Sequence, residues 1–296
     1  MTEVEQIYIQ VVESGSFKKA AEHLKLEPSS ITRKIAALED RLQVKLLRRS
    51  TQRTTPTELG QLYYQGLRKI VDEQNALEEM IRGGVKQLSG KLRIAAPVDF
   101  GAQFVMPVVR KLQQQAPDLS VELLLGSYFE NLVEQNLDVA VRIGALQDSS
   151  LIARKLGQLH RVLVASPAYL AQYGTPTQLE QLVDHNFILY SSIQASSDIK
   201  FADGSCFPHF LIKSNITVNS VTAIRKLVLD GIGIHLGPRW LFSDDIKRNQ
   251  VIQLLPEKLL ESFPVNAIYT ERAYLPEKIK LFIALMSEHL SLTNEI

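Results

Sequence analysis

The chain has 296 residues, which is long enough for more than one domain with a sizeable core. Its 33 Lys and Arg residues balance 32 Asp and Glu residues, so no excess of charge over the whole chain points to a nucleic acid or a membrane, and any such signal must be local. The single cysteine, Cys206, excludes an internal disulfide framework, and because we find neither a signal peptide nor a membrane-spanning run, we expect a cytoplasmic protein.

Apolar residues recur at helical spacing in three consecutive stretches near the N-terminus. They are Val4, Ile7, Tyr8 and Val11, then Phe17, Ala20, Ala21 and Leu24, and then Ile31, Ile35, Leu38 and Leu42. Ser16 is placed to cap the second stretch and Pro28 to begin the third. The pattern predicts three short helices, and the Thr- and Arg-rich segment 44–57 that follows is typical of an extended hairpin.

The outer face of the third predicted helix is small, polar and basic at its N-terminal end. Ser29 and Arg33 lie opposite the apolar stripe, Ser30 and Thr32 flank them, and Lys34 adds a charge. A helix that enters the major groove N-terminus first needs short side chains, hydroxyls and an arginine that can bind guanine. An ordinary solvated helix face is the alternative, and the basic hairpin behind the helix favours DNA binding.

Residues 58–83 form a longer helical pattern. Its apolar positions are separated by steps of four and three residues, with Gln74 among them; they are Tyr63, Leu67, Ile70, Leu77 and Ile81. This spacing is typical of a coiled-coil seam, so we expect a helix that dimerises the chain. A helix packed on its own domain is the alternative.

From Lys91 onward strands and helices alternate, which predicts an α/β domain with a mostly parallel sheet. The expected strands are 91–97, 119–126, 138–144, 161–167, 186–192, 213–219, 251–256 and 265–271. The expected helices include 104–115, 128–135 and a C-terminal amphipathic helix at 277–290.

The sequence offers no constellation for catalysis. The six histidines show no metal-ligand spacing, and the glycines of residues 231–237 follow a helical run and miss the dinucleotide fingerprint, so we interpret them as a tight turn. Cys206 with His209 nearby allows a reactive thiol, but a half-buried cysteine is the simpler interpretation. We therefore expect no enzyme, no cofactor and no metal.

Residues 1–60 resemble the DNA-binding domain of LysR-type transcriptional regulators. The stretch "VVESGSFKKAAEHLKLEPSSITRKIAALEDRL" follows the family's E-x-G-S-F-x-x-A-A-x-x-L and then S-R-x-I-x-x-L-E, with Thr32 at the first position of the second motif. The resemblance continues through "DVAVRIGALQDSSLIARKLG", "VLVASPAYLAQYGTP", "DGIGIHLGPRW" and "YLPEKIKLFI", and so spans essentially the whole chain.

The resemblance implies an N-terminal all-α winged helix-turn-helix domain at 1–58, a linker and dimerisation helix with a hinge at 59–89, and a C-terminal α/β effector-binding domain at 90–296. That domain would resemble periplasmic binding proteins, with lobe I at 90–163 and 266–296 and lobe II at 164–265. The implied protein is a sequence-specific transcriptional regulator, a homodimer or homotetramer on an interrupted palindrome of double-stranded DNA. A small-molecule effector between the lobes would tune it.

The resemblance also implies site residues. Those expected at DNA are Ser16, Lys18, Lys19, Ser29, Ser30, Thr32, Arg33 and Lys34, with Arg49 and Arg53 in the wing. Those expected at the effector are Val98, Asp99, Phe100, Ile143, Gly144, Ser191, Ser192 and Asn219. An ionised Asp99 would disfavour a simple carboxylate there.

Three residues depart from the family pattern. Glu27 replaces a Ser or Thr that caps the third helix, Gln43 replaces a glycine at its end, and Gln52 replaces an arginine of the wing. An alternative from another class also stays open: a small-molecule binding protein whose N-terminal helices serve only dimerisation, which would show no salt-dependent affinity for DNA.

Overall fold

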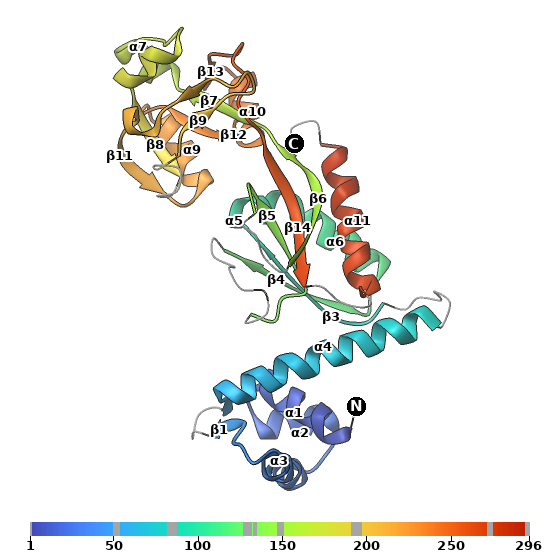
Figure 1. The fold of residues 1–296 in the computed structure, drawn as a ribbon. Helices are drawn as coiled ribbons and strands as arrows, with labels where there is room; N and C mark the ends of the chain where they lie inside the picture. Colours follow the sequence, from blue (N-terminus) through green and yellow to red (C-terminus); the bar gives the residue numbers. More distant parts are fainter. Residues whose placement is uncertain are drawn as a thin grey trace. The chain divides into compact units, whose positions relative to one another are not determined.

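The computed structural model describes residues 2–49, 54–81, 88–126, 132, 135–146, 151–190, 197–270 and 275–293, with the backbone alone at 49, 72, 76 and 79–81 (Figure 1). The chain divides into two compact units, the first built on Met1–Gln87 and the second on Leu88–Leu132, Leu137–Glu271 and Lys278–Ile296. None of the described helices is long and apolar enough to cross a membrane.

In the first unit, three short helices lead through a two-stranded antiparallel hairpin to a long helix. The elements are α1 (Glu3–Ser14), α2 (Phe17–Leu24), α3 (Pro28–Leu42), β1 (Leu47–Arg49), β2 (Thr54–Pro56) and α4 (Glu58–Ile81). The predicted order of three helices, hairpin and long helix is confirmed. Their apolar faces meet in one core around the buried Tyr8, Ile31 and Ile35.

The ends of the short helices follow from local chemistry. The Ser16 hydroxyl accepts a hydrogen bond from the Lys19 N–H at 3.4 Å and so caps α2. At α3 the Glu27 side chain makes no capping bond, and the helix instead begins with Pro28 in its first turn. Gln43 ends α3 in the left-handed conformation, with φ 55°, the backbone that the family's glycine adopts without strain.

The second unit contains a five-stranded mixed sheet in the order β4-β3-β5-β14-β6. Its strands are β3 (Gly90–Ala96), β4 (Leu119–Leu125), β5 (Val139–Ile143), β6 (Leu151–Leu159) and β14 (Phe263–Thr270). β3 pairs in parallel with β4 and β5, whereas β14 runs antiparallel to both β5 and β6. Within this sheet the expected parallel pairing therefore holds only for β3, β4 and β5, and a second parallel pair joins β8 (Asn186–Tyr190) to β11 (Lys213–Val218).

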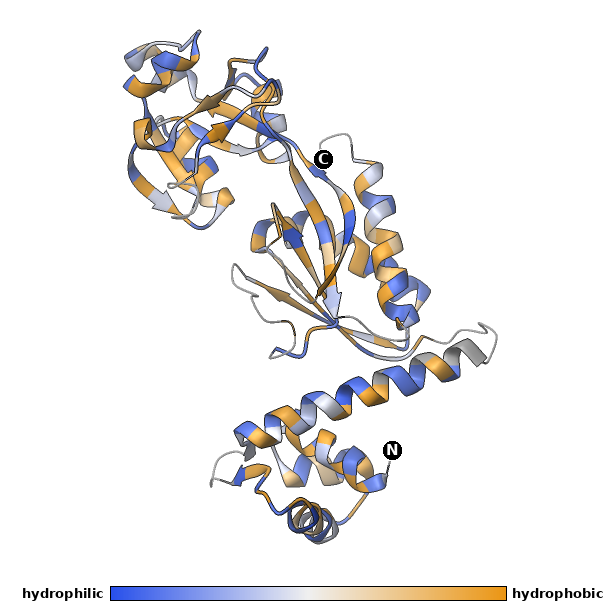
Figure 2. Cartoon of the chain, viewed as in Figure 1, coloured by the Kyte–Doolittle hydropathy of each residue, from blue (hydrophilic) through white to orange (hydrophobic). Residues whose placement is uncertain are grey.

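Helices cover this sheet, and together they form what we call the first subdomain. They are α5 (Val98–Phe100), the π-helical turn η1 (Gly101–Val105), α6 (Met106–Gln115) and α11 (Glu277–Ser291). Figure 1 shows α6 and α11 side by side, and the Lys111 Nζ of α6 lies 4.0 Å from the Glu288 Oε1 of α11. The apolar face of α11, visible in Figure 2, is buried through residues such as Phe282 and Met286.

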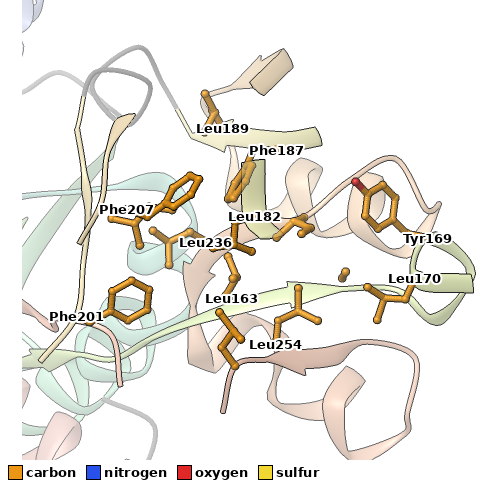
Figure 3. Close-up of a cluster of buried hydrophobic side chains, with 14 residues drawn as sticks. Leu163, Tyr169, Leu170, Leu182, Phe187, Leu189, Phe201, Phe207, Leu236 and Leu254 are labelled. Carbon is orange, nitrogen blue, oxygen red and sulfur yellow. The ribbon is translucent and has the colours of Figure 1, made fainter. Parts of the chain in front are cut away.

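The chain between the sheet strands β6 and β14 forms the second subdomain. Its strands are β7 (Arg161–Ala165), β8 (Asn186–Tyr190), β9 (Ile199–Lys200), β10 (Cys206–Phe207), β11 (Lys213–Val218), β12 (His235–Pro238) and β13 (Ile252–Leu254). Its helices are α7 (Pro167–Tyr173), η2 (Leu179–Asp184), η3 (His209–Leu211), α9 (Val221–Leu229) and α10 (Arg239–Lys247). Figure 3 shows one of its cores, in which Leu163, Phe187 and Leu236 pack together.

Several strands differ from the sequence predictions, among them β9 and β10, which were not predicted. β6 has no counterpart among the predicted strands, and residues 235–238, interpreted as part of a tight turn, form the strand β12. β7, from Arg161, pairs within the second subdomain, and β14, from Phe263, pairs within the sheet of the first. The helix expected at 128–135 lies largely outside the described residues.

Candidate DNA-binding surface and effector site

The N-terminal end of α3 presents polar side chains to solvent. Ser29 and Arg33 are exposed, and within the described part of the chain Arg33 makes no hydrogen bond or ion pair. Lys18 and Lys19, in the first turn of α2, are exposed as well. Four of the residues expected at DNA thus lie on the surface of the helix-turn-helix motif, where their polar groups can meet a partner.

Three other residues of the predicted set already use their polar groups or are less accessible. The Thr32 hydroxyl donates to the Pro28 carbonyl at 3.0 Å, and Ser30 is half-buried. Lys34 forms an ion pair with Glu3 of α1, so its side chain leans toward α1 and away from the free face of α3. This ion pair joins α3 to α1.

The hairpin predicted as the wing is held by a buried carboxylate that the sequence analysis did not single out. Glu39 Oε1 accepts the N–H groups of Leu46 and Leu47 at 2.9 and 3.1 Å, and Oε2 lies 2.9 Å from Lys45 Nζ. Burial opposes ionisation of Glu39, but these donors outweigh it and hold its pKa below the usual value. Glu39 therefore fixes the start of β1 on α3.

The wing residues themselves are only partly described. The backbone of Arg49 pairs with Thr54 in the β1–β2 hairpin, and its side chain is not described. Arg53 and Gln52 lie outside the described residues.

The apolar residues of α4 lie on two faces, and this changes the predicted seam. Leu67 is 6% exposed and belongs to the core of the first unit, and the Tyr63 ring packs at 5.5 Å from the Tyr8 ring. Both side chains therefore contact the core of the first unit.

Another apolar stripe on α4 faces solvent. It consists of Leu59, Leu62, Ile70 and Leu77, which are among the exposed large hydrophobic residues of the chain. Ile70 and Leu77 belong to the predicted seam; the side chain of Ile81 is not described. Steps of three, eight and seven residues keep the four side chains on one face of the helix.

The residues expected at the effector occupy strand ends and a helix start in the second unit. Val98 is exposed and Asp99 half-buried directly after β3, and Ile143 ends β5. Gly144 has φ 99°, a conformation that suits glycine, and its N–H donates to the Pro264 carbonyl at 2.9 Å. Asn219 is exposed directly after β11.

Phe100 is 2% exposed and its ring centroid lies 4.8 Å from that of Phe104, so its side chain belongs to the core. Ser191 and Ser192 lie outside the described residues.

The structure also shows a contact that the sequence analysis missed. Asp99 accepts hydrogen bonds from the Val221 N–H at 3.1 Å and from the Thr222 hydroxyl at 2.5 Å. The two segments are more than a hundred residues apart, and the one local signal was Ser220, a helix-capping residue after β11.

Comparisons with known proteins agree with the architecture. A family model for the LysR substrate binding domain matches residues 86–291, and one for the bacterial regulatory helix-turn-helix protein of the lysR family matches residues 6–61. The HTH-type transcriptional activator AaeR of Escherichia coli (strain K12) is 33% identical over 283 residues, which cover 96% of this chain and 92% of AaeR. The HTH-type transcriptional regulator CrgA of Neisseria meningitidis serogroup C is 31% identical over 285 residues, which cover 96% of this chain and 95% of CrgA.

Solved structures give the same result. The structure of CrgA, a LysR-type transcriptional regulator from Neisseria meningitidis, matches with a TM-score of 0.61 and 30% identity, covering 98% of this chain and 99% of that chain. The full-length structure of the Vibrio cholerae virulence activator AphB matches with a TM-score of 0.61 and 27% identity, covering 98% of this chain and 100% of that chain. The chain belongs to the LysR family: it is a DNA-binding transcriptional regulator, not an enzyme, and its C-terminal domain is the family's effector-binding domain.

Proposed function

We propose that this regulator reads its operator with the N-terminal half of α3 in the major groove of double-stranded DNA. The observation that carries the proposal is the exposed Arg33, whose guanidinium makes no hydrogen bond or ion pair within the described part of the chain. A free guanidinium at that end of a recognition helix can bind the two acceptors of guanine. Ser29 lies one turn earlier on the same face and contacts bases or the adjoining phosphates.

The surrounding residues position the helix. Lys18 and Lys19 neutralise phosphates from the first turn of α2, where Ser16 caps the helix. Arg49 and Arg53 of the wing serve phosphates or a narrow minor groove. The hydrogen bonds from Leu46 and Leu47 to Glu39 support this role, because they fix the wing relative to α3.

The test uses an operator selected by the full-length chain from a random pool of double-stranded DNA, and a fluorescence titration of that operator. Arg33→Ala should weaken specific binding by about 1–3 kcal/mol, or roughly tenfold to a hundredfold, because one bidentate base contact is lost. Arg33→Lys keeps the positive charge but loses the two parallel N–H donors of the guanidinium. It should therefore weaken specific binding while preserving most of the affinity for unrelated DNA.

Lys69→Ala is the control, since Lys69 is an exposed basic residue of α4 in the same unit. It should leave operator affinity unchanged. Equal affinity of wild type and Arg33→Ala would contradict the assignment of α3.

We further propose that the chain acts as a homodimer, and as a homotetramer on an interrupted palindrome. The exposed stripe Leu59, Leu62, Ile70 and Leu77 supports a second copy of α4 as the partner, because a self-complementary apolar face suits a twofold interface. Two copies of α3 related in this way would read two half-sites.

The effector domain completes the proposed mechanism. A small molecule binds where β3 and β5 end and α9 begins, near Val98, Ile143, Gly144 and Asn219, and it changes the affinity or geometry of the dimer on DNA. The regulator acts in the cytoplasm, where the chromosomal DNA of a bacterium lies. The two lobes on either side of this effector site are the first and second subdomains.

A further inference from the structure

The contact between Asp99 and α9 joins the first subdomain to the second. Asp99 lies in α5, directly after β3, and its two carboxylate oxygens take one donor each from α9: the Val221 N–H at 3.1 Å and the Thr222 hydroxyl at 2.5 Å. These donors belong to the first two residues of a nine-residue helix. A carboxylate is thus bound at the N-terminus of α9, and it comes from the chain itself.

The first turn of α9 is well matched to a carboxylate. The first N–H groups of a helix have no partner within the helix, and the positive end of the helix dipole lies there. Ser220 caps the helix by accepting from the Ala223 N–H at 3.3 Å, which leaves the Val221 N–H to an outside acceptor. Hydrogen bonds of this kind to an ionised acceptor are about twice as strong as neutral ones.

The arginine of α9 does not compete for Asp99. Arg225 lies one turn beyond Thr222, but its guanidinium is held by Asp245 of α10 through two hydrogen bonds of 2.5 Å each. Within the described residues, Asp99 therefore meets α9 through a backbone N–H and a hydroxyl alone. The contact therefore selects a carboxylate through hydrogen bonds, and not by pairing it with a positively charged side chain.

A second contact between the same two subdomains provides a reporter. The ring of Phe104, in η1, meets the indole of Trp240, in α10, edge to face at 5.3 Å. Trp240 is the only tryptophan of the chain, and its indole nitrogen is buried. Its fluorescence therefore senses whether the first subdomain stays against the second.

We propose that Asp99 is an internal ligand of the effector domain: its carboxylate fills the α9 site, holds the two subdomains together and keeps acidic groups of effectors away from that helix. The inference rests on the proposed function, in which the effector binds where β3 ends and α9 begins. It adds a chemical class to that function. An effector of this regulator does not dock a carboxylate on α9, because the chain supplies that carboxylate itself.

The test replaces the internal carboxylate with an external one. Asp99→Gly in the full-length chain removes the side chain, so its melting temperature should fall and the emission of Trp240 should move to longer wavelength as the indole meets water. Sodium formate, compared with sodium chloride at equal ionic strength, should reverse both changes in Asp99→Gly and leave wild type unaffected. Adding Thr222→Val, which removes one of the two donors, should weaken the rescue.

Two further variants keep the test decisive if Asp99→Gly does not fold. Asp99→Asn and Thr222→Val should each lower the melting temperature by about 2–4 °C, and together by little more than the larger single effect, because both weaken the same contact. Additive effects, or an equal response to formate in wild type and Asp99→Gly, would overturn the proposal. These measurements contain no DNA, so a failure here leaves the titration of Arg33→Ala as an independent test of the proposed function.

Discussion

Gly60 lies where α4 passes the start of the wing, and the close approach explains why no side chain fits there. A Cβ at Gly60 would lie 1.9 Å from the Leu46 carbonyl oxygen and 2.8 Å from the Tyr8 hydroxyl. The same hydroxyl donates to the Gly60 carbonyl at 2.8 Å, and burial raises the pKa of Tyr8. The glycine thus lets α1, the wing and α4 meet.

We expect Gly60→Ala to destabilise the first unit by about 1–3 kcal/mol, because the backbone must shift to admit the methyl group. Gly66→Ala is the matched control in the same helix, since a Cβ at Gly66 meets no atom within 4 Å. It should stabilise the helix by up to about 1 kcal/mol. Thermal unfolding at one protein concentration measures both, and a neutral Gly60→Ala would contradict the packing described.

His235 makes the second subdomain sensitive to acid. Its Nδ1 donates to the Ile188 carbonyl at 2.7 Å, its Nε2 is buried and makes no hydrogen bond within the described residues, and burial lowers the pKa of His235 to about 4. In the unfolded chain a histidine titrates near 6.5, so between these values the unfolded state binds a proton that the folded state does not. Stability is therefore full above about pH 6.5 and falls as the pH drops toward 4.

The predicted loss from this residue is about 2 kcal/mol between pH 7 and pH 5. Urea unfolding at the two pH values should show the loss in wild type and in His160→Asn, which changes an exposed histidine. His235→Leu should be less stable at pH 7 but lose less on acidification. The same acid dependence in His235→Leu would refute the assignment.

Helix α9 is fixed to α10 by a bidentate ion pair. Asp245 is fully buried and its two oxygens accept from Arg225, whose side chain is 34% exposed. The hydrogen bonds to Asp245 are the largest influence on Arg225 and raise its pKa. Because the charge of Asp245 is out of water, removal of its partner leaves it uncompensated.

Arg225→Gln should therefore cost about 3 kcal/mol in the free energy of unfolding, measured in urea. The double variant Arg225→Met with Asp245→Leu should recover much of that loss, since an apolar pair of similar volume leaves no buried charge. Lys247→Gln breaks an exposed pair with Asp244 and should cost no more than about 0.5 kcal/mol. A loss in Arg225→Gln as small as that of Lys247→Gln would show that the pair is not needed.

The elements that sequence predicts well are those with one clear apolar face. The stripes of α1, α2 and α3 fix three helices, and the apolar runs of β3, β4 and β5 fix three neighbouring strands. β6 is not predicted from the sequence because it is an edge strand with four consecutive exposed residues, so its buried and exposed residues do not alternate. β12 is not predicted because it contains Gly237, and a glycine in such a segment is typical of a turn. In the structure Gly237 packs against the His235 ring.

The candidate site residues also divide into those that a local pattern predicts well and those that it does not. The polar face of α3 follows from helical geometry alone, and Ser29 and Arg33 are exposed as that geometry requires. Leu67 and Phe100 are predicted at binding surfaces but are buried, because α4 and α5 each carry apolar residues on more than one face. The contact of Asp99 with Thr222 joins residues far apart in sequence, and no local pattern encodes such a contact.

For the whole molecule, the exposed stripe of α4 predicts the oligomeric state. Leu62→Asp places a charge on a residue that is 66% exposed in the single chain, so it should leave folding intact and shift the protein to a smaller species in sedimentation velocity. Asn75→Asp, an exposed position on the opposite side of α4, is the control and should keep the wild-type species. A wild-type sedimentation profile for Leu62→Asp would place the dimer interface elsewhere.

The entry of α3 into the groove, N-terminus first, can be tested with a single attached probe. Because Cys206 is the only cysteine, Cys206→Ser gives a background in which Ser29→Cys or Asn75→Cys carries a photoactivatable cross-linker. With the selected operator, the probe at position 29 should cross-link to bases in two symmetric half-sites, and the probe at position 75 should not. Binding of the operator without cross-links from position 29, or equal cross-linking from both positions, would contradict the claim.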